Sequence, residues 1–140
     1  PLALKDLGIY TQVTKTGNTY VVKKEKIAWF RFDKKNDIHI TKGSSLYGYS
    51  AVFAPTKIRQ KISHVWLYET RNEWKVKSII PFPINGGRDG GYRGYTLKNN
   101  LEEGRWRLEV QTSRGQIIGR KTFTIHYVTS GPLEETKIKQ

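Results

Sequence analysis

Hydrophobic and polar residues alternate along several short stretches of the chain, which is the pattern of β-strands with one buried face. The clearest stretch is Gly104–Val110, in which Trp106, Leu108 and Val110 alternate with charged residues. We predict a strand here with these three side chains in the core. Trp106 is then expected to be a packing residue rather than a platform for a ligand.

The next stretch pairs with this strand. Ser113–Gln116 has the composition of a hairpin turn, with a glycine where a positive φ is needed. The chain then returns through Ile117–Tyr127, and its inward residues are expected to join those of the first strand in one core. The residues expected on that face are Phe123, Ile125 and Tyr127.

Other segments are rich in strand-forming residues and end at proline or charged turns. Strands are predicted at Ser45–Phe53, Ile62–Tyr68 and Trp74–Ile80, and short strands or an extended arm at Thr19–Lys23 and Ala28–Phe32. Leu2–Leu7 is expected to form one helical turn.

Turn signals about every 8 to 12 residues, without a long stretch of helical period, predict an all-β fold, an antiparallel sandwich of the immunoglobulin-like kind. A small barrel is the alternative. We expect residues 1–37 to form an N-terminal extended arm or edge strands of the same domain. Residues 38–130 are expected to form the sandwich core, and residues 131–140 a loose polar tail.

Charge indicates the class of partner. The 140 residues include 25 basic and 12 acidic side chains, a formal net charge of +13, which favours nucleic acid, acidic glycan or anionic lipid. The chain has no cysteine, which excludes disulfides and thiolate metal sites, and no apolar run of the roughly 20 residues needed to cross a bilayer. It lacks methionine and begins at Pro1, so we expect it to be a piece of a longer protein.

The segment Gly86–Tyr95 contains five glycines together with arginine and tyrosine, a composition typical of a shaped loop that presents side chains. Guanidinium groups here would bind an anion, and aromatic rings would stack on a sugar or base. The alternative is a turn whose arginines bond nearby carbonyls and hold adjacent strands. The predicted ligand-binding residues are Arg88, Tyr92, Arg93, Tyr95, His64 and Trp66.

The sequence favours binding over catalysis. His39, His64 and His126 lie too far apart for the usual metal-ligand spacing, so no metal site is predicted. No serine lies in a nucleophile-elbow motif, and Glu102 and Glu103 are adjacent in a turn, where solvation is expected. The glycines also lack the lysine–serine pattern or following helix of nucleotide-binding loops. We therefore predict no catalytic residues and no cofactor.

Several pieces of the chain agree in order and spacing with one family: Tyr47–Pro55, His64–Trp66, Gly86–Arg88 with Gly91–Arg93, Gly104–Val110, and Ile118–Arg120 followed by Phe123. Together they resemble an uncharacterised bacterial family, domain of unknown function 2914. Members often carry this domain at the C-terminal end of a membrane protein. The resemblance implies an extracytoplasmic, membrane-tethered domain and supplies no activity or catalytic residues.

These observations predict a non-catalytic extracytoplasmic module of a bacterial membrane protein, located in the periplasm. Its expected partner is an acidic envelope glycan or a protein, and its tether lies outside this chain. A single-stranded nucleic-acid binder is a less favoured alternative, because such a sheet would expose alternating aromatic and basic residues, whereas Trp106, Leu108 and Val110 predict a core face. A purely structural domain that packs on its own membrane portion is the third possibility.

Overall fold

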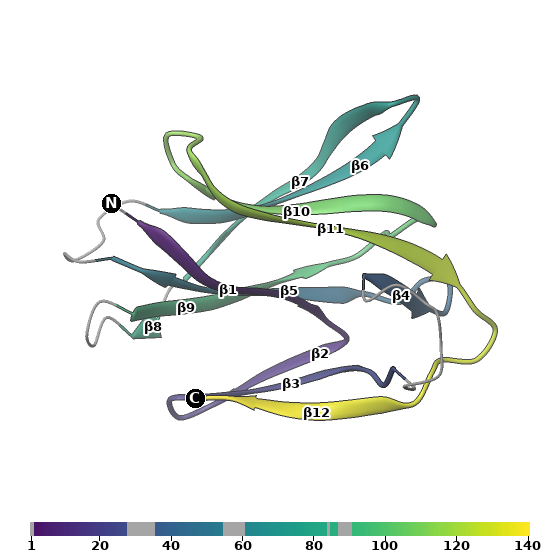
Figure 1. Cartoon of the computed structure of the whole chain (residues 1–140), viewed down its shortest axis with the longest axis horizontal. Helices are drawn as coiled ribbons and strands as arrows, with labels where there is room; N and C mark the ends of the chain where they lie inside the picture. The colour runs from purple at the N-terminus through teal and green to yellow at the C-terminus, as the bar shows by residue number, and fades with distance from the viewer. Residues whose placement is uncertain (1, 28–35, 55–60, 84, 87–90) are drawn as a thin grey trace.

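A computed structural model describes residues 2–27, 36–54, 61–83, 85–86 and 91–140, which form strands, turns and loops (Figure 1). Within these ranges there is no helix long and apolar enough to cross a membrane. The strands are β1 (Ala3–Tyr10), β2 (Gln12–Thr16), β3 (Thr19–Glu25), β4 (Asp37–Ile40), β5 (Leu46–Phe53), β6 (Ile62–Thr70), β7 (Glu73–Phe82), β8 (Asn85–Gly86), β9 (Gly91–Lys98), β10 (Gly104–Thr112), β11 (Ile117–Tyr127) and β12 (Glu134–Lys139).

Two of the three sheets pack face to face as a sandwich (Figure 1). The four-stranded sheet has the order β1-β5-β9-β8 and the five-stranded sheet the order β4-β11-β10-β6-β7. Neighbouring strands are antiparallel except for β4, which runs parallel to β11. The first order corresponds to strands A-B-E-D of immunoglobulin domains, and β11-β10-β6-β7 corresponds to G-F-C with an added C′. The predicted immunoglobulin-like sandwich is therefore confirmed.

The core between these sheets contains the predicted inward residues of β10 and β11. Trp106, Leu108, Phe123 and Ile125 form one buried cluster, which also includes Trp66 of β6. Val110 is equally buried but belongs to a neighbouring cluster. The prediction of one shared core thus needs this small correction, because β10 is long enough for its far end to pack on Val52, Ile62 and Phe82 instead.

A third sheet, in the order β12-β3-β2, covers the outer face of the four-stranded sheet (Figure 1). Strands β2 and β3 form a hairpin that is inserted between β1 and β4, and β12 comes from the far end of the chain. The hairpin buries apolar and aromatic side chains against tyrosines of β1 and β5. The buried members of this contact are Tyr10, Val13, Tyr20, Val22 and Tyr49, with the half-buried Tyr47 beside them.

Two expectations for the chain ends are wrong. Leu2–Leu7 is not a helical turn, since Ala3–Tyr10 forms β1 and pairs with β5. Leu133–Gln140 is not a loose tail, since Glu134–Lys139 forms β12 and pairs with β3. Both segments form strands because each pairs with a strand far away in the sequence, and local composition does not predict that pairing. The strand expected at Ala28–Phe32 lies outside the described residues.

Candidate functional site

Much of the glycine-rich segment is a strand rather than a loop. Residues Gly91–Lys98 form β9, which pairs with β5 along its whole length. Arg93 and Tyr95 therefore lie on one face of the sheet, where both contact Tyr20, and Tyr92 lies on the other face. Arg88 lies outside the described residues.

Arg93 points from β9 toward the third sheet. Its guanidinium donates hydrogen bonds to the backbone carbonyls of Lys139, at 3.1 Å, and of Asn18. Its Cζ atom also lies 4.8 Å from the ring centroid of Tyr20. These contacts join β9 to both the β2–β3 hairpin and β12, so the geometry favours the alternative in which this arginine holds strands together.

The predicted tyrosines occupy different surroundings. Tyr95 is 37% exposed, and its ring centroid lies 6.2 Å from that of Tyr20 and 6.1 Å from that of Tyr47. It therefore lies at the margin of the tyrosine contact under the third sheet. Tyr92 is half-buried near the other end of the strand pair, opposite Val52.

His64 and Trp66 are both fully buried, each with 0% exposure, so a surface ligand does not reach them. The two imidazole nitrogens of His64 lie 3.0 Å from Ser50 Oγ and 2.7 Å from Thr96 Oγ1. Burial lowers the pKa of His64 from 6.5 to about 3, because the charged imidazolium is disfavoured in the core. The prediction that these two residues bind a surface ligand is therefore wrong, because alternation along β6 directs both side chains into the sandwich.

Replacing Arg93 by alanine should destabilise the domain. We expect Arg93→Ala to lower the free energy of unfolding by about 1 to 3 kcal/mol, because two charge-assisted hydrogen bonds are lost and two carbonyls lose their donor. Chemical denaturation measures this loss. Arg114→Ala is a suitable control, since Arg114 is exposed in the β10–β11 turn. If the Arg93→Ala variant keeps its stability but binds ligand more weakly, Arg93 is a ligand-binding residue as the sequence predicted.

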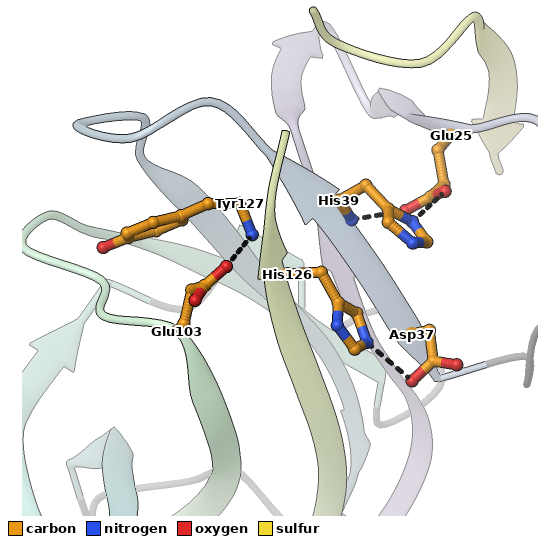
Figure 2. A network of polar contacts seen from close by, with 6 residues as sticks. All are labelled: Glu25, Asp37, His39, Glu103, His126 and Tyr127. Atoms are coloured by element: carbon orange, nitrogen blue, oxygen red, sulfur yellow. Dashed lines mark hydrogen bonds and ion pairs between the residues drawn. The ribbon is translucent and has the colours of Figure 1, made fainter. Parts of the chain in front are cut away.

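The other two histidines lie side by side on β4 and β11 (Figure 2). Their rings are stacked, with centroids 5.1 Å apart. His39 Nδ1 lies 2.9 Å from Glu25 Oε2, and His126 Nε2 lies 3.2 Å from Asp37 Oδ1. Glu25 also accepts the backbone N–H of His39, so this network ties β3 to the sandwich edge. Among the described residues there is no group of three or more side chains suited to hold a metal ion.

A cleft opens beside this network, between the third sheet and the edge of the sandwich. Its volume is about 90 Å³, and its lining includes the apolar residues Ile9, Leu46 and Phe123. Charges of both signs line it, including Lys24 and Glu25. Burial lowers the pKa of Lys24, and the neighbouring Lys137 adds to this effect. Mixed charge around a small cleft does not favour one class of ligand.

The sequence interpretation missed a polar pocket between the middle of β7 and the end of β9. Its volume is about 260 Å³, and it is lined by Lys77, Lys98, Asn100, Glu102 and Trp106. Lys98, which was not among the predicted site residues, is the last residue of β9. The available signal was the two-residue spacing of Gly94, Thr96 and Lys98, which places this lysine on the inward face.

Arginines on the outer face of the five-stranded sheet are already paired. Arg105 lies 3.3 Å from Glu69, and Arg107 and Arg120 lie 3.8 and 4.0 Å from the buried Glu109. Arg107 also stacks on Trp74, with its Cζ atom 4.2 Å from the ring centroid. These guanidinium groups therefore stabilise the sheet face, and lysines supply more of the uncompensated charge.

Residues 59–125 match the model of a family described as "Protein of unknown function (DUF2914)". The predicted resemblance to this family is thereby confirmed for the strands from β6 to most of β11. The match supplies no activity. No curated protein matches the chain.

Two solved structures are similar to this chain in fold. One is Pseudomonas fluorescens alkylpurine DNA glycosylase AlkC bound to DNA containing an abasic site analog, with 12% identity, a TM-score of 0.48 and coverage of 89% of this chain. The chain spans only 30% of the length of that glycosylase. The other is an immunoglobulin-like protein from Pseudomonas aeruginosa, with 10% identity, a TM-score of 0.43, and coverage of 90% of this chain and 97% of that protein.

Proposed function

We propose that this domain is a non-catalytic binding module that recognises an acidic glycan of the bacterial envelope. The observation that carries this proposal is the balance of charge. With 25 basic and 12 acidic side chains, pairing of every carboxylate would still leave the net charge of +13. Such an excess attracts anionic polymers and raises their rate of association.

The positions of the histidines support a module without catalysis. Ser50 and His64 lie 3.0 Å apart, a distance typical of a nucleophile and its base. Both residues are nevertheless 0% exposed, and a substrate has no access to them. His39 and His126 are each engaged by a carboxylate in the network that joins β3, β4 and β11.

The cellular location is part of the proposal and rests on the family resemblance. Members of the family that this chain resembles often carry this domain at the C-terminal end of membrane proteins, so we place it on the extracytoplasmic side, tethered through a segment outside this chain. An envelope glycan would be within reach of a domain held there. Carboxylates and phosphates are common anionic groups that lysine binds as a point charge.

A protein partner is the second candidate, and the outer face of the five-stranded sheet favours it. Val76 and Ile79 of β7 are 54% and 63% exposed, and Trp74 lies beside them under Arg107. Aromatic residues and arginine are enriched at protein interfaces. This face would bind an apolar surface and would depend little on salt.

Binding of an acidic polysaccharide should depend strongly on salt. We expect the domain to bind polygalacturonate but not neutral dextran, with affinity falling about tenfold or more between about 50 and about 200 mM salt, because the contacts release counterions. Fluorescence or calorimetric titration measures both affinities.

Binding that is unchanged by salt would contradict this electrostatic account. Absence of binding at low salt would reject the acidic-glycan function and leave the protein partner as the stronger candidate. Single-stranded DNA belongs in the same series. If it binds much more tightly than polygalacturonate at equal salt, the nucleic-acid alternative replaces the glycan.

A further inference from the structure

Lys98 occupies a position on β9 whose side chain faces the core, where an apolar residue is expected. Thr96, two residues earlier, contacts His64 in the core, so alternation directs Lys98 to the same inward face. Lys98 is only 8% exposed. A lysine this buried is rare unless its charge is paired. Its position therefore requires a physical reason.

The ammonium group of Lys98 has no carboxylate partner among the described residues. Its one hydrogen bond there goes to the backbone carbonyl of Asn99, at 2.8 Å, and its Nζ atom lies 5.8 Å from the ring centroid of Trp106. Burial lowers the pKa of Lys98, and the positive charge of Lys77 lowers it further. An ammonium has three N–H donors, so the carbonyl leaves capacity for a further acceptor. Burying an uncompensated charge is costly, and an anion would relieve that cost.

The pocket next to Lys98 has room for such an anion. Its volume of about 260 Å³ far exceeds the space that one water needs. Lys77 reaches it from β7, where its Nζ atom lies 5.9 Å from the ring centroid of Tyr68. The opposite wall comes from the segment that joins β9 to β10. Its backbone is held in place because Trp106 Nε1 donates to the carbonyl of Glu102 at 2.9 Å.

The charges lining the pocket favour a monoanion that also carries hydroxyl groups. Two ammonium groups and the single carboxylate of Glu102 give a net charge of one positive unit. One carboxylate neutralises this net charge, whereas a dianionic phosphate would leave one excess negative charge and would be repelled more strongly by Glu102. Glu102 can accept hydrogen bonds from hydroxyls, and the amide of Asn100 can donate or accept them.

We infer that this pocket is the specific subsite of the proposed glycan-binding function and that it takes one uronic acid unit. The sugar carboxylate lies between Lys77 and Lys98, and its ring hydroxyls face Asn100 and Glu102. This inference rests on the proposed function, since it names the unit of the acidic glycan that is recognised. The remaining positive charge of the domain attracts the polymer, and the pocket selects its carboxylate.

Titration with trigalacturonate tests the subsite, followed by calorimetry and by the NMR signal of the Trp106 indole N–H. We expect Lys98→Met and Lys77→Gln each to weaken binding about tenfold, because each removes a charge-assisted contact to the carboxylate. Lys75→Gln is the matched control, since Lys75 is exposed on the same strand and does not line the pocket. It should change affinity less than about twofold. The indole signal should shift on titration of the unmodified domain.

Stability separates binding from folding in this series. Lys98→Met removes an uncompensated buried charge and keeps the length of the side chain, so its melting temperature should not fall. Equal weakening by all three lysine variants would overturn the subsite while leaving the proposed function intact. Tighter binding of a sulfated or phosphorylated trisaccharide would overturn the choice of a uronic acid. If the unmodified domain binds no polyanion at all, the proposed function itself is rejected.

Discussion

Replacing Trp106 by alanine is expected to lower the free energy of unfolding by about 3 to 5 kcal/mol, the range typical of a fully buried tryptophan. Trp106 is 1% exposed and packs in the main core cluster. Its ring centroid lies 4.9 Å from that of Tyr68, and its indole N–H donates to the carbonyl of Glu102. The substitution leaves a cavity and also leaves that carbonyl without its donor. Denaturant unfolding monitored by circular dichroism measures the loss.

Trp74→Ala is the control for this measurement. Trp74 lies on the outer face of the five-stranded sheet and is half-buried under Arg107, so its loss should cost about 1 kcal/mol or less. Trp106→Phe should fall between the two, since it keeps most of the packing and loses the hydrogen bond. Equal effects of Trp74→Ala and Trp106→Ala would contradict the assignment of Trp106 to the core.

Acidification should destabilise the domain through His64. The pKa of His64 is lowered to about 3 in the folded state, against 6.5 for an ordinary histidine, so between these values the unfolded chain binds a proton that the folded domain does not. Stability from this group is complete above pH 6.5 and is lost as the pH falls toward 3. At a pH of about 4.5 the loss amounts to roughly 2 to 3 kcal/mol, because each unit below 6.5 costs about 1.4 kcal/mol.

A histidine variant isolates this contribution from that of the carboxylates. His64→Gln retains groups able to bond Ser50 and Thr96 but does not titrate. The difference in unfolding free energy between a pH of about 7.5 and about 4.5 should therefore shrink by roughly 2 to 3 kcal/mol in this variant. An acid dependence that is the same in the variant and in the unmodified domain would show that His64 charges freely in the folded state.

The sandwich itself could be predicted from the sequence because its signals are local. Alternation along Gly104–Val110 places Trp106 and Leu108 inward, and the β10–β11 turn brings Phe123 opposite Trp106. The same alternation places His64 and Trp66 inward on β6. The prediction that these two residues lie beside a surface loop was wrong, because the alternation along β6 indicates that both side chains are buried.

In the third sheet, a short strand or extended arm was predicted at Thr19–Lys23, within β3, but β12 had no comparable signal. The sequence Glu-Glu-Thr-Lys-Ile-Lys of β12 is polar and lies at the opposite end of the chain from β3, with which it pairs. Its order depends on backbone pairing and on contacts made after folding, such as the 3.0 Å ion pair between Lys139 and Asp6. The alternation of hydrophobic and polar residues along a sequence does not indicate which strands pair when they are so far apart in the chain.

The candidate site was only partly accessible to sequence reasoning. Composition drew attention to Gly86–Tyr95, but the glycines suggested a loop where β9 pairs with β5. Once the register is known, Arg93 faces the third sheet and Lys98 faces inward. The lysine pocket depends on this register and on the approach of β7, neither of which is encoded locally.

The origin of the third sheet also bears on the order of events during folding. Hairpins such as β6–β7 and β10–β11 join neighbouring segments and can close early, because short loops lose little entropy. The β3–β12 pairing joins Glu25 to Glu134 and so closes nearly the whole chain into one loop. On a ribosome, one edge of β3 therefore stays unpaired until β12 has been synthesised. That interval is when wrong strand pairing between neighbouring nascent chains would compete most strongly with the native fold.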